Sequence, residues 1–184
     1  MLTLAKKWTE RELLRLPKED GKYELVDGDL VLMSPAHFDH GTICASMTIR
    51  LGAYVLEKKL GIIAEGQTGF WMANGNLRSP DISFISIATL SKLERLPTGF
   101  FKGAPDLAVE VFSPSERTKQ LNGKIADYFA SGTKLVWVIY PKSRSARIYR
   151  KPNAKRLIGE DEKLDGEDVV PGFKVRVGDL FPRI

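Results

Sequence analysis

Hydrophobic positions along the chain follow two periods, one typical of helices and one typical of strands. Between residues 39 and 60, apolar side chains recur at helical spacing and predict the longest helix of the protein. A second helix is predicted over about residues 119–130, ending at Gly132. A capping-box spacing begins at Thr9, so we also expect a short first helix that ends near Pro17.

Strand-like runs occupy most of the remaining chain. The run YELVDGDLVLM (23–33) contains two alternating segments joined around Asp27-Gly28 and predicts a β-hairpin. The stretch NGNLRSP (74–80) is rich in residues that break regular structure and predicts a loop. Further strands are expected over residues 62–72, 81–86, 106–112, 135–140 and 146–151, with a short helical piece at 90–93 and short strands in the tail around turns at 165–166 and 171–172.

This order of elements predicts an α+β or mixed α/β fold with one central sheet. A β-helix-β crossover over residues 106–140 should join two parallel strands by a right-handed connection. The chain has 184 residues, of which 43% are hydrophobic, and this suits one compact core. We therefore expect residues 1–184 to form a single domain.

Composition excludes several classes of protein. No stretch approaches the roughly 20 consecutive apolar residues that span a bilayer, and the charged N-terminus is unlike a signal peptide. We therefore expect a cytoplasmic protein. The single cysteine, Cys44, excludes an internal disulfide and is interpreted as a small core residue. The chain lacks GxGxxG, Walker A, GxSxG and HExxH motifs, so dinucleotide-binding, nucleotide-triphosphate, serine-hydrolase and zincin functions lack their usual residues.

Positive charge is concentrated in one part of the chain. The net charge is +5, but residues 116–156 contain eleven Lys or Arg and two acidic residues, a local balance of +9. Such a concentration suits a polyanion such as nucleic acid. The alternative is an ordinary solvated surface that keeps the protein soluble.

Two acidic residues stand where the strand pattern is otherwise apolar. Glu110 lies in the middle of the run at 107–112, and a buried carboxylate there needs a cationic side chain or a metal ion. Asp81 follows Pro80, so it should lie at the opening of its strand. If the two strands are neighbours, about 4.8 Å apart, the two carboxylates are placed to share one hard cation. The alternatives are a structural ion pair or an edge position for Glu110, and a turn cap for Asp81.

Other charged residues are less distinctive. Lys124 falls within the apolar stripe of the helix at 119–130, so it should either extend to solvent or face the carboxylates. Glu24 lies on the hairpin, where an alternating acid needs no special role. The two histidines, His37 and His40, lack the thiolates and the spacing of a zinc site, so a capping or surface role is the default.

These residues and several longer runs resemble one family. Pro80-Asp81, Glu110 in a hydrophobic strand and Lys124 on the next helix resemble the PD-(D/E)XK nuclease superfamily with its lysine relocated. More narrowly, roughly residues 9–181 resemble the Uma-type family of restriction endonuclease-like proteins, with the motifs in family order. The matching runs are YELVDGDLVLMSP (23–35), His40 before the long helix, SPDISFI (79–85), GAPDLAVEVFSPS (103–115), KIADYFASG (124–132), LVWVIYP (135–141) and PGF before a closing LF (171–173, 180–181).

The resemblance implies a restriction-endonuclease-like fold, with a central mixed sheet flanked by helices, and a Mg²⁺-dependent DNA endonuclease. Asp81 and Glu110 would hold the Mg²⁺, for which Mn²⁺ is expected to substitute. Glu24, as a further metal ligand, and Lys124 would complete the active site. The usual superfamily lysine stands two residues after the glutamate, and here that position is Phe112. The catalytic assignment therefore depends on Lys124 reaching back from its helix.

The resemblance also suggests partners. His40 lies at a family motif position and is assigned only a phosphate-contact or structural role. DNA is the expected partner and a membrane is not, and the sequence contains no base-reading code. A homodimer is the assembly suggested by analogy, since a symmetric pair would place two sites on the two strands of a duplex. Two alternatives remain: an inactive nuclease fold that binds nucleic acid or protein, suggested by Phe112, and a purely structural pair of Lys124 with Glu110.

Overall fold

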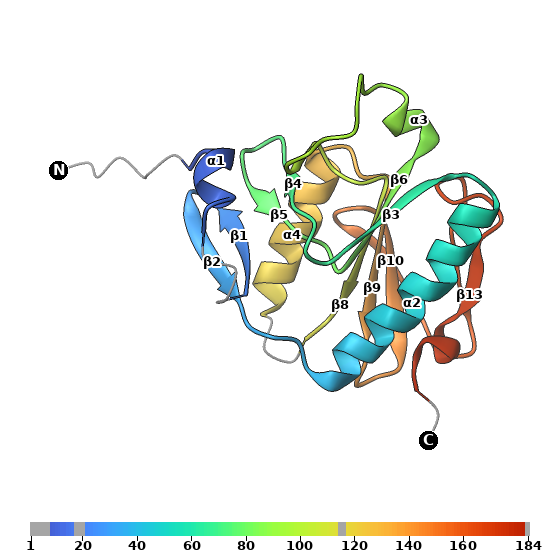
Figure 1. Cartoon of the computed structure of the whole chain (residues 1–184). Helices are drawn as coiled ribbons and strands as arrows, with labels where there is room; N and C mark the ends of the chain where they lie inside the picture. Colours follow the sequence, from blue (N-terminus) through green and yellow to red (C-terminus); the bar gives the residue numbers. More distant parts are fainter. Residues whose placement is uncertain (1–7, 17–20, 114–116, 183–184) are drawn as a thin grey trace.

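The structure, a computed structural model, describes residues 8–16, 21–113 and 117–182 (Figure 1). Its largest sheet has six strands in the order β11-β10-β9-β8-β6-β3. The strands β8 and β9 run parallel, and the other neighbours run antiparallel, so the sheet is mixed. The bounds are β3 Gly61–Glu65, β6 Ile82–Ser86, β8 Leu107–Val111, β9 Leu135–Tyr140, β10 Ser145–Lys151 and β11 Ala154–Ile158.

A second sheet contains the N-terminal hairpin. It has five strands in the order β2-β1-β5-β4-β7, with bounds β1 Lys22–Val26, β2 Asp29–Met33, β4 Phe70–Trp71, β5 Leu77–Arg78 and β7 Phe101–Lys102. Asp27 and Gly28 have φ of 52° and 92°, the two positive values that a type I′ hairpin turn requires. Two further strands, β12 Lys163–Asp165 and β13 Lys174–Arg176, pair with each other near the C-terminus.

Two long helices cover opposite faces of the six-stranded sheet. Helix α2 (Phe38–Glu57) buries four residues spaced four apart, and this stripe joins the core cluster that contains Val109 and Trp137. The four are Ile43, Met47, Leu51 and Val55. Helix α4 (Thr118–Ala130) connects β8 to the parallel strand β9, and it packs with Ala108 and Val138 on the other face. Figure 1 shows α4 between the six-stranded sheet and the hairpin sheet. Side chains of α4 therefore reach both sheets. The short helices are α1 Glu10–Leu13, α3 Ile87–Leu90 and a 3₁₀ turn at Val177–Leu180.

The α+β class, the mixed central sheet, the hairpin and the parallel β8–α4–β9 unit confirm the predicted architecture. The prediction of one continuous strand over residues 62–72 is wrong, because β3 and β4 belong to different sheets and are separated by a turn at residues 66–69. The predicted loop at 74–80 contains β5, and the short strand β7 was not predicted. Strands of two residues are too short to carry a periodic signal. The helix predicted at 90–93 lies at Ile87–Leu90, the first helix ends at Leu13, and Pro17 lies outside the described residues.

No helix in the described part of the chain is both long enough and apolar enough to cross a bilayer.

Candidate active site

Glu110 is the last residue but one of β8, and its side chain is directed toward α4. It is 2% exposed, and its carboxylate receives a hydrogen bond of 2.5 Å from the Tyr128 hydroxyl. The Lys124 ammonium lies 3.4 Å from the other carboxylate oxygen and is itself only 6% exposed. Lys124 and Tyr128 are four residues apart, so both lie on the α4 face that packs against β8. The lysine therefore reaches back toward the glutamate.

Glu24 approaches the same lysine from the hairpin sheet. Its Oε1 atom lies 3.9 Å from Lys124 Nζ and accepts a hydrogen bond from the backbone amide of Ser79. Its Oε2 atom accepts a hydrogen bond of 3.0 Å from Arg78 on β5. Glu24 is 1% exposed, so the expectation that this acid is an ordinary hairpin residue is wrong. The hairpin brings a carboxylate into the interior, where Arg78 provides its principal cationic partner.

Arg78 links the hairpin sheet to α4. Its Nε atom donates a hydrogen bond of 2.7 Å to Asp127 Oδ2, while Nη1 donates to Glu24. The amide groups of Asn74 and Asn76 also donate to the Asp127 carboxylate, at 2.7 and 2.9 Å. Burial lowers the pKa of Arg78, but the charges of Glu24 and Asp127 outweigh this effect and raise it. Two buried carboxylates therefore share one permanently charged guanidinium.

Asp81 lies immediately before β6, the strand that pairs with the Glu110 strand β8. The ladder pairs Ile82 with Val109, so one further step places Asp81 beside Glu110. The Asp81 Oδ2 atom accepts hydrogen bonds from the Val111 amide at 2.8 Å and lies 3.1 Å from His40 Nε2. Burial opposes ionisation, but the hydrogen bond from His40, the Lys22 charge and the Val111 amide lower the pKa of Asp81. The condition that the two strands are neighbours is met, because β6 pairs with β8.

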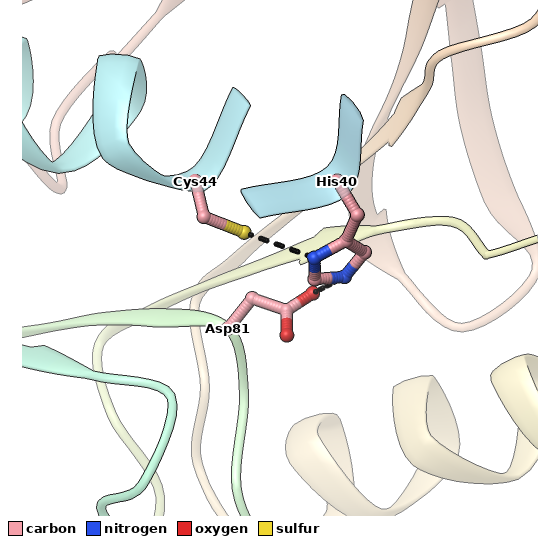
Figure 2. Close-up of side chains that lie close together, drawn as sticks. All are labelled: His40, Cys44 and Asp81. Atoms are coloured by element: carbon pink, nitrogen blue, oxygen red, sulfur yellow. Dashed lines mark hydrogen bonds and ion pairs between the residues drawn. The ribbon is translucent and has the colours of Figure 1, made fainter. Parts of the chain in front are cut away.

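His40 and Cys44 approach Asp81 from helix α2 (Figure 2). The Cys44 Sγ atom lies 3.5 Å from His40 Nδ1, on the side of the ring opposite the contact with Asp81. The hydrogen bond to Asp81 is the largest cause that raises the pKa of His40, and burial partly opposes it. Burial is the largest cause that raises the pKa of the Cys44 thiol, and the charges of Asp81 and Glu110 add to it. A capping or surface role does not describe His40, and Cys44 is half-buried at the margin of the core.

Two of the three predicted metal ligands, Asp81 and Glu110, are hard oxygen donors whose carboxylates contact different helices: Asp81 contacts His40 of α2, and Glu110 contacts Lys124 and Tyr128 of α4. Asp81 and Glu110 bring carboxylates from adjacent strands, and Mg²⁺ is bound through one or two such groups together with water. Glu24 fits the role of a metal ligand less well, because its Oε2 atom is bound by the permanently charged guanidinium of Arg78. Its contacts suit a residue that orients Lys124 and Arg78.

Four residues of this site were not recognised in the sequence as members of it. Arg78 falls within the predicted loop at 74–80, where nothing marks it as a buried residue. The pattern of the helix places Tyr128 in the apolar stripe and gives no sign of its contact with Glu110. Asp127 lies three residues after Lys124, and this helical spacing between charged residues was an available signal. Cys44 lies four residues after His40 on a helix, and that spacing predicts that the two side chains share a face.

The basic segment is partly neutralised by acids from elsewhere in the chain. Several of its cations form ion pairs with carboxylates that lie outside residues 116–156, which reduces the positive charge available to a polyanion. These pairs are Lys134 with Asp106, Arg144 with Glu160, and Arg150 with Glu167 and Asp168.

Comparisons with known proteins identify the family and the fold of the chain. The family model Uma2, described as "Putative restriction endonuclease", matches residues 11–178. The chain belongs to the Uma2 family. The fold is similar to a crystal structure described as "a putative nuclease belonging to DUF820 from Anabaena variabilis ATCC 29413", with a TM-score of 0.80 and 20% identity over 95% of this chain and 97% of that chain. No curated protein matches the sequence. The predicted family and the restriction-endonuclease-like fold are confirmed.

Proposed function

We propose that this Uma2 protein is a Mg²⁺-dependent endonuclease that hydrolyses DNA phosphodiester bonds. The observation that carries the proposal is the approach of Lys124 Nζ to within 3.4 Å of Glu110 Oε2, on the strand next to Asp81. Phe112 occupies the position where the nuclease superfamily usually has its lysine. An amine supplied by α4 instead restores the combination of two carboxylates and one lysine.

The residues of the chain have separate roles in this mechanism. Mg²⁺ held by Asp81 and Glu110 would offset charge on the phosphoryl group and make water a better nucleophile. Lys124 is placed to orient that water or to donate a hydrogen bond to a phosphoryl oxygen. Tyr128 holds the second oxygen of Glu110 at 2.5 Å, and this contact limits rotation of the carboxylate. His40 would position Asp81 through its contact of 3.1 Å.

Glu24 and Arg78 hold the Lys124 amine in place. Glu24 Oε1 lies 3.9 Å from Lys124 Nζ, and Arg78 holds Glu24 through Oε2. Arg78 also binds Asp127, which lies one turn of α4 beyond Lys124. The hairpin sheet and α4 are thereby fixed relative to each other on either side of the lysine. A positioned amine loses less entropy when the substrate binds than one that extends freely into solvent.

DNA is the substrate class that the family description and the basic segment support. Phosphate contacts from this segment would weaken as salt concentration rises, because binding releases condensed counterions. The contacts described here include no base-reading pattern, so the proposal names no recognition sequence. The homodimer, the single-domain organisation, the cytoplasmic location and a phosphate contact by His40 stay predictions from the sequence.

The test is cleavage of supercoiled and linear DNA in the presence of Mg²⁺ or Mn²⁺. Wild type should nick the plasmid, whereas Asp81→Asn and Glu110→Gln should lose cleavage. Asp106→Asn is the matched control, because Asp106 is also a buried acid at β8 but pairs with the exposed Lys134. Intact DNA with wild type, or equal cleavage by wild type and both site variants, would exclude the proposed activity.

One observation favours a second function, a nuclease fold that binds nucleic acid without hydrolysing it. Three acids of the site already have a permanently or ordinarily cationic partner, Lys124 for Glu110 and Arg78 for Glu24 and Asp127, and Asp81 has one when the His40 ring is protonated. Carboxylates that already have cationic partners attract a divalent ion less strongly. Calorimetry separates the two functions, since salt-sensitive DNA binding without any heat of Mg²⁺ binding supports the binding module. Saturable Mg²⁺ binding that Glu110→Gln removes supports the enzyme.

A further inference from the structure

Three potential metal ligands of different chemistry meet near the start of α2. His40 and Cys44 are four residues apart on this helix, so their side chains lie on one face, and Asp81 lies opposite them at the opening of β6 (Figure 2). One ligand atom from each residue lies within 4.8 Å of the other two. All three side chains are partly buried rather than enclosed. An ion could therefore enter from solvent.

We propose that His40, Cys44 and Asp81 form a second metal site, which takes a thiophilic divalent ion such as Zn²⁺. Imidazole nitrogen, thiolate sulfur and carboxylate oxygen are the usual protein ligands of Zn²⁺, and three of them leave the fourth tetrahedral position for water. With metal–ligand distances of about 2.0 to 2.3 Å, the ligand atoms of such a site lie about 3.3 to 3.8 Å apart. The observed separations are 3.5 Å between Cys44 Sγ and His40 Nδ1, and 3.1 Å between His40 Nε2 and Asp81 Oδ2.

Binding requires a small rearrangement of the imidazole. The ring of His40 presents Nδ1 to Cys44 and Nε2 to Asp81, whereas an ion coordinates only one of these nitrogens. The ring must therefore turn and exchange one hydrogen bond for a bond to the metal. The Cys44 thiol loses its proton to solvent as its sulfur binds the ion. Because no backbone hydrogen bond of α2 or β6 has to break, the helix and strand remain in place.

The electrostatic surroundings favour a cation over a free thiolate. Burial and, after it, the charges of Asp81 and Glu110 raise the pKa of the Cys44 thiol, so its sulfur carries a proton in the metal-free protein. The same negative charges attract a divalent ion, whose own charge stabilises the thiolate once it is bound. Sulfur and nitrogen ligands select this ion against Mg²⁺, which prefers oxygen. The chemistry of the cluster therefore differs from that of the Asp81–Glu110 pair.

A regulatory consequence follows for the proposed nuclease, and only this consequence depends on that function. Asp81 belongs to both sites, so an ion bound to His40 and Cys44 withdraws the carboxylate from Mg²⁺. Zn²⁺ would then inhibit cleavage by competing for one shared ligand. Cys44 determines this competition, since Asp81 and His40 without the sulfur form a weaker site for a thiophilic ion.

Titration of the metal-free protein with Co²⁺ tests the site without any activity measurement. Because Cys44 is the only cysteine in the chain, a sulfur-to-cobalt charge-transfer band in the near ultraviolet reports this residue alone. We expect the band to saturate at one Co²⁺ per chain, to disappear in Cys44→Ser and to be lost in His40→Gln and Asp81→Asn. His37→Gln is the matched control, because His37 is exposed one turn before His40, and its band should be unchanged. Absence of the band in wild type, or its persistence in both His40→Gln and Asp81→Asn, overturns the site.

Cleavage assays with Zn²⁺ test the competition. The wild-type rate in Mg²⁺ should fall when one equivalent of Zn²⁺ is added and recover with a chelator selective for Zn²⁺. Cys44→Ser should keep the same rate with and without that equivalent. Equal inhibition of wild type and Cys44→Ser would overturn the competition. Failure of the metal-free wild type to cleave DNA in Mg²⁺ would instead remove the proposed function, while the Co²⁺ spectrum still decides the metal site.

Discussion

Strand β8 has a buried acid at each end, and the two acids differ in their partners. Asp106 immediately precedes the strand and is 4% exposed, and Glu110 lies near its end and is 2% exposed. Each is paired with a lysine, Lys134 at 2.7 Å and Lys124 at 3.4 Å. The side chain of Lys134 is 54% exposed, whereas that of Lys124 is 7% exposed. The two acids are both buried, whereas only one of the two lysines is buried.

This difference separates a structural acid from a candidate catalytic one. The second oxygen of Asp106 accepts a hydrogen bond from the Ser86 amide at the start of α3, so its contacts are those of a structural cap. Its lysine keeps most of its hydration. At the other end, both Glu110 and Lys124 lose water, which is costly unless a function retains them. Burial of the cation, rather than of the acid alone, therefore distinguishes the candidate catalytic acid Glu110 from the structural acid Asp106.

The largest expected effect is on cleavage. Lys124→Met should reduce the rate of DNA nicking by about 10²- to 10⁴-fold, the range for loss of a positioned acid–base group. Lys134→Met should remain within about twofold of wild type, because a surface ammonium at the other end of β8 does not contact the reacting groups. Rates of supercoiled plasmid nicking in Mg²⁺ measure both. Equal losses in the two variants would mean that the two ends of β8 do not differ in function.

A second prediction concerns the guanidinium of Arg78, which binds the buried carboxylates of Glu24 and Asp127. Arg78→Met should lower the free energy of unfolding by about 4 kcal/mol, because Glu24 and Asp127 would stay buried without their cation. Chemical denaturation measures this change. Adding Glu24→Gln and Asp127→Asn to the variant should recover a large part of the loss. The control Arg144→Met, which removes an exposed partner of Glu160, should cost less than about 1 kcal/mol.

The two lysines should also differ in their contribution to stability. Lys124→Met should cost about 3 kcal/mol, because it leaves a buried carboxylate without its cation, and Lys134→Met less than about 1 kcal/mol. Combining Lys124→Met with Glu110→Gln should cost less than the sum of the single changes. Urea denaturation in the presence of a chelator gives each value. Additive costs would show that Lys124 and Glu110 do not stabilise each other.

The smallest expected effect is a pH dependence of the stability that Asp106 contributes. Burial raises the pKa of Asp106, but hydrogen bonds from Lys134 and the Ser86 amide outweigh it and lower the pKa below its ordinary value of 3.8. The ionised carboxylate therefore stabilises the fold above that value, and this contribution is lost as the pH falls through the lowered pKa. Asp106→Asn should cost about 1.5 kcal/mol at neutral pH. The difference from wild type should shrink only below pH 3.8, and a constant difference down to the acid transition would contradict the assignment.

Much of this arrangement could be predicted because it depends on local spacing. The interruption of an apolar strand by Glu110 and the place of Lys124 within an apolar stripe are both visible within a few residues. The hairpin turn follows from Asp27-Gly28 in the same way. Arg78 could not be identified, because its partners Glu24 and Asp127 lie 54 and 49 residues away in the chain. The neutralisation of the basic segment could not be predicted either, because its cations pair with acids that are distant in the chain.

The sequence by itself determined the helices, most strands, the family resemblance and the presence of a charged group in the core. These properties depend on periodicity and on motifs, which are written in neighbouring residues. Only the tertiary structure decided that the hairpin belongs to a second sheet, that one guanidinium serves two carboxylates, and that a cysteine faces a histidine and Asp81. Such contacts depend on how helices and sheets pack, and the partners of a buried charge are chosen by that packing rather than by distance along the chain.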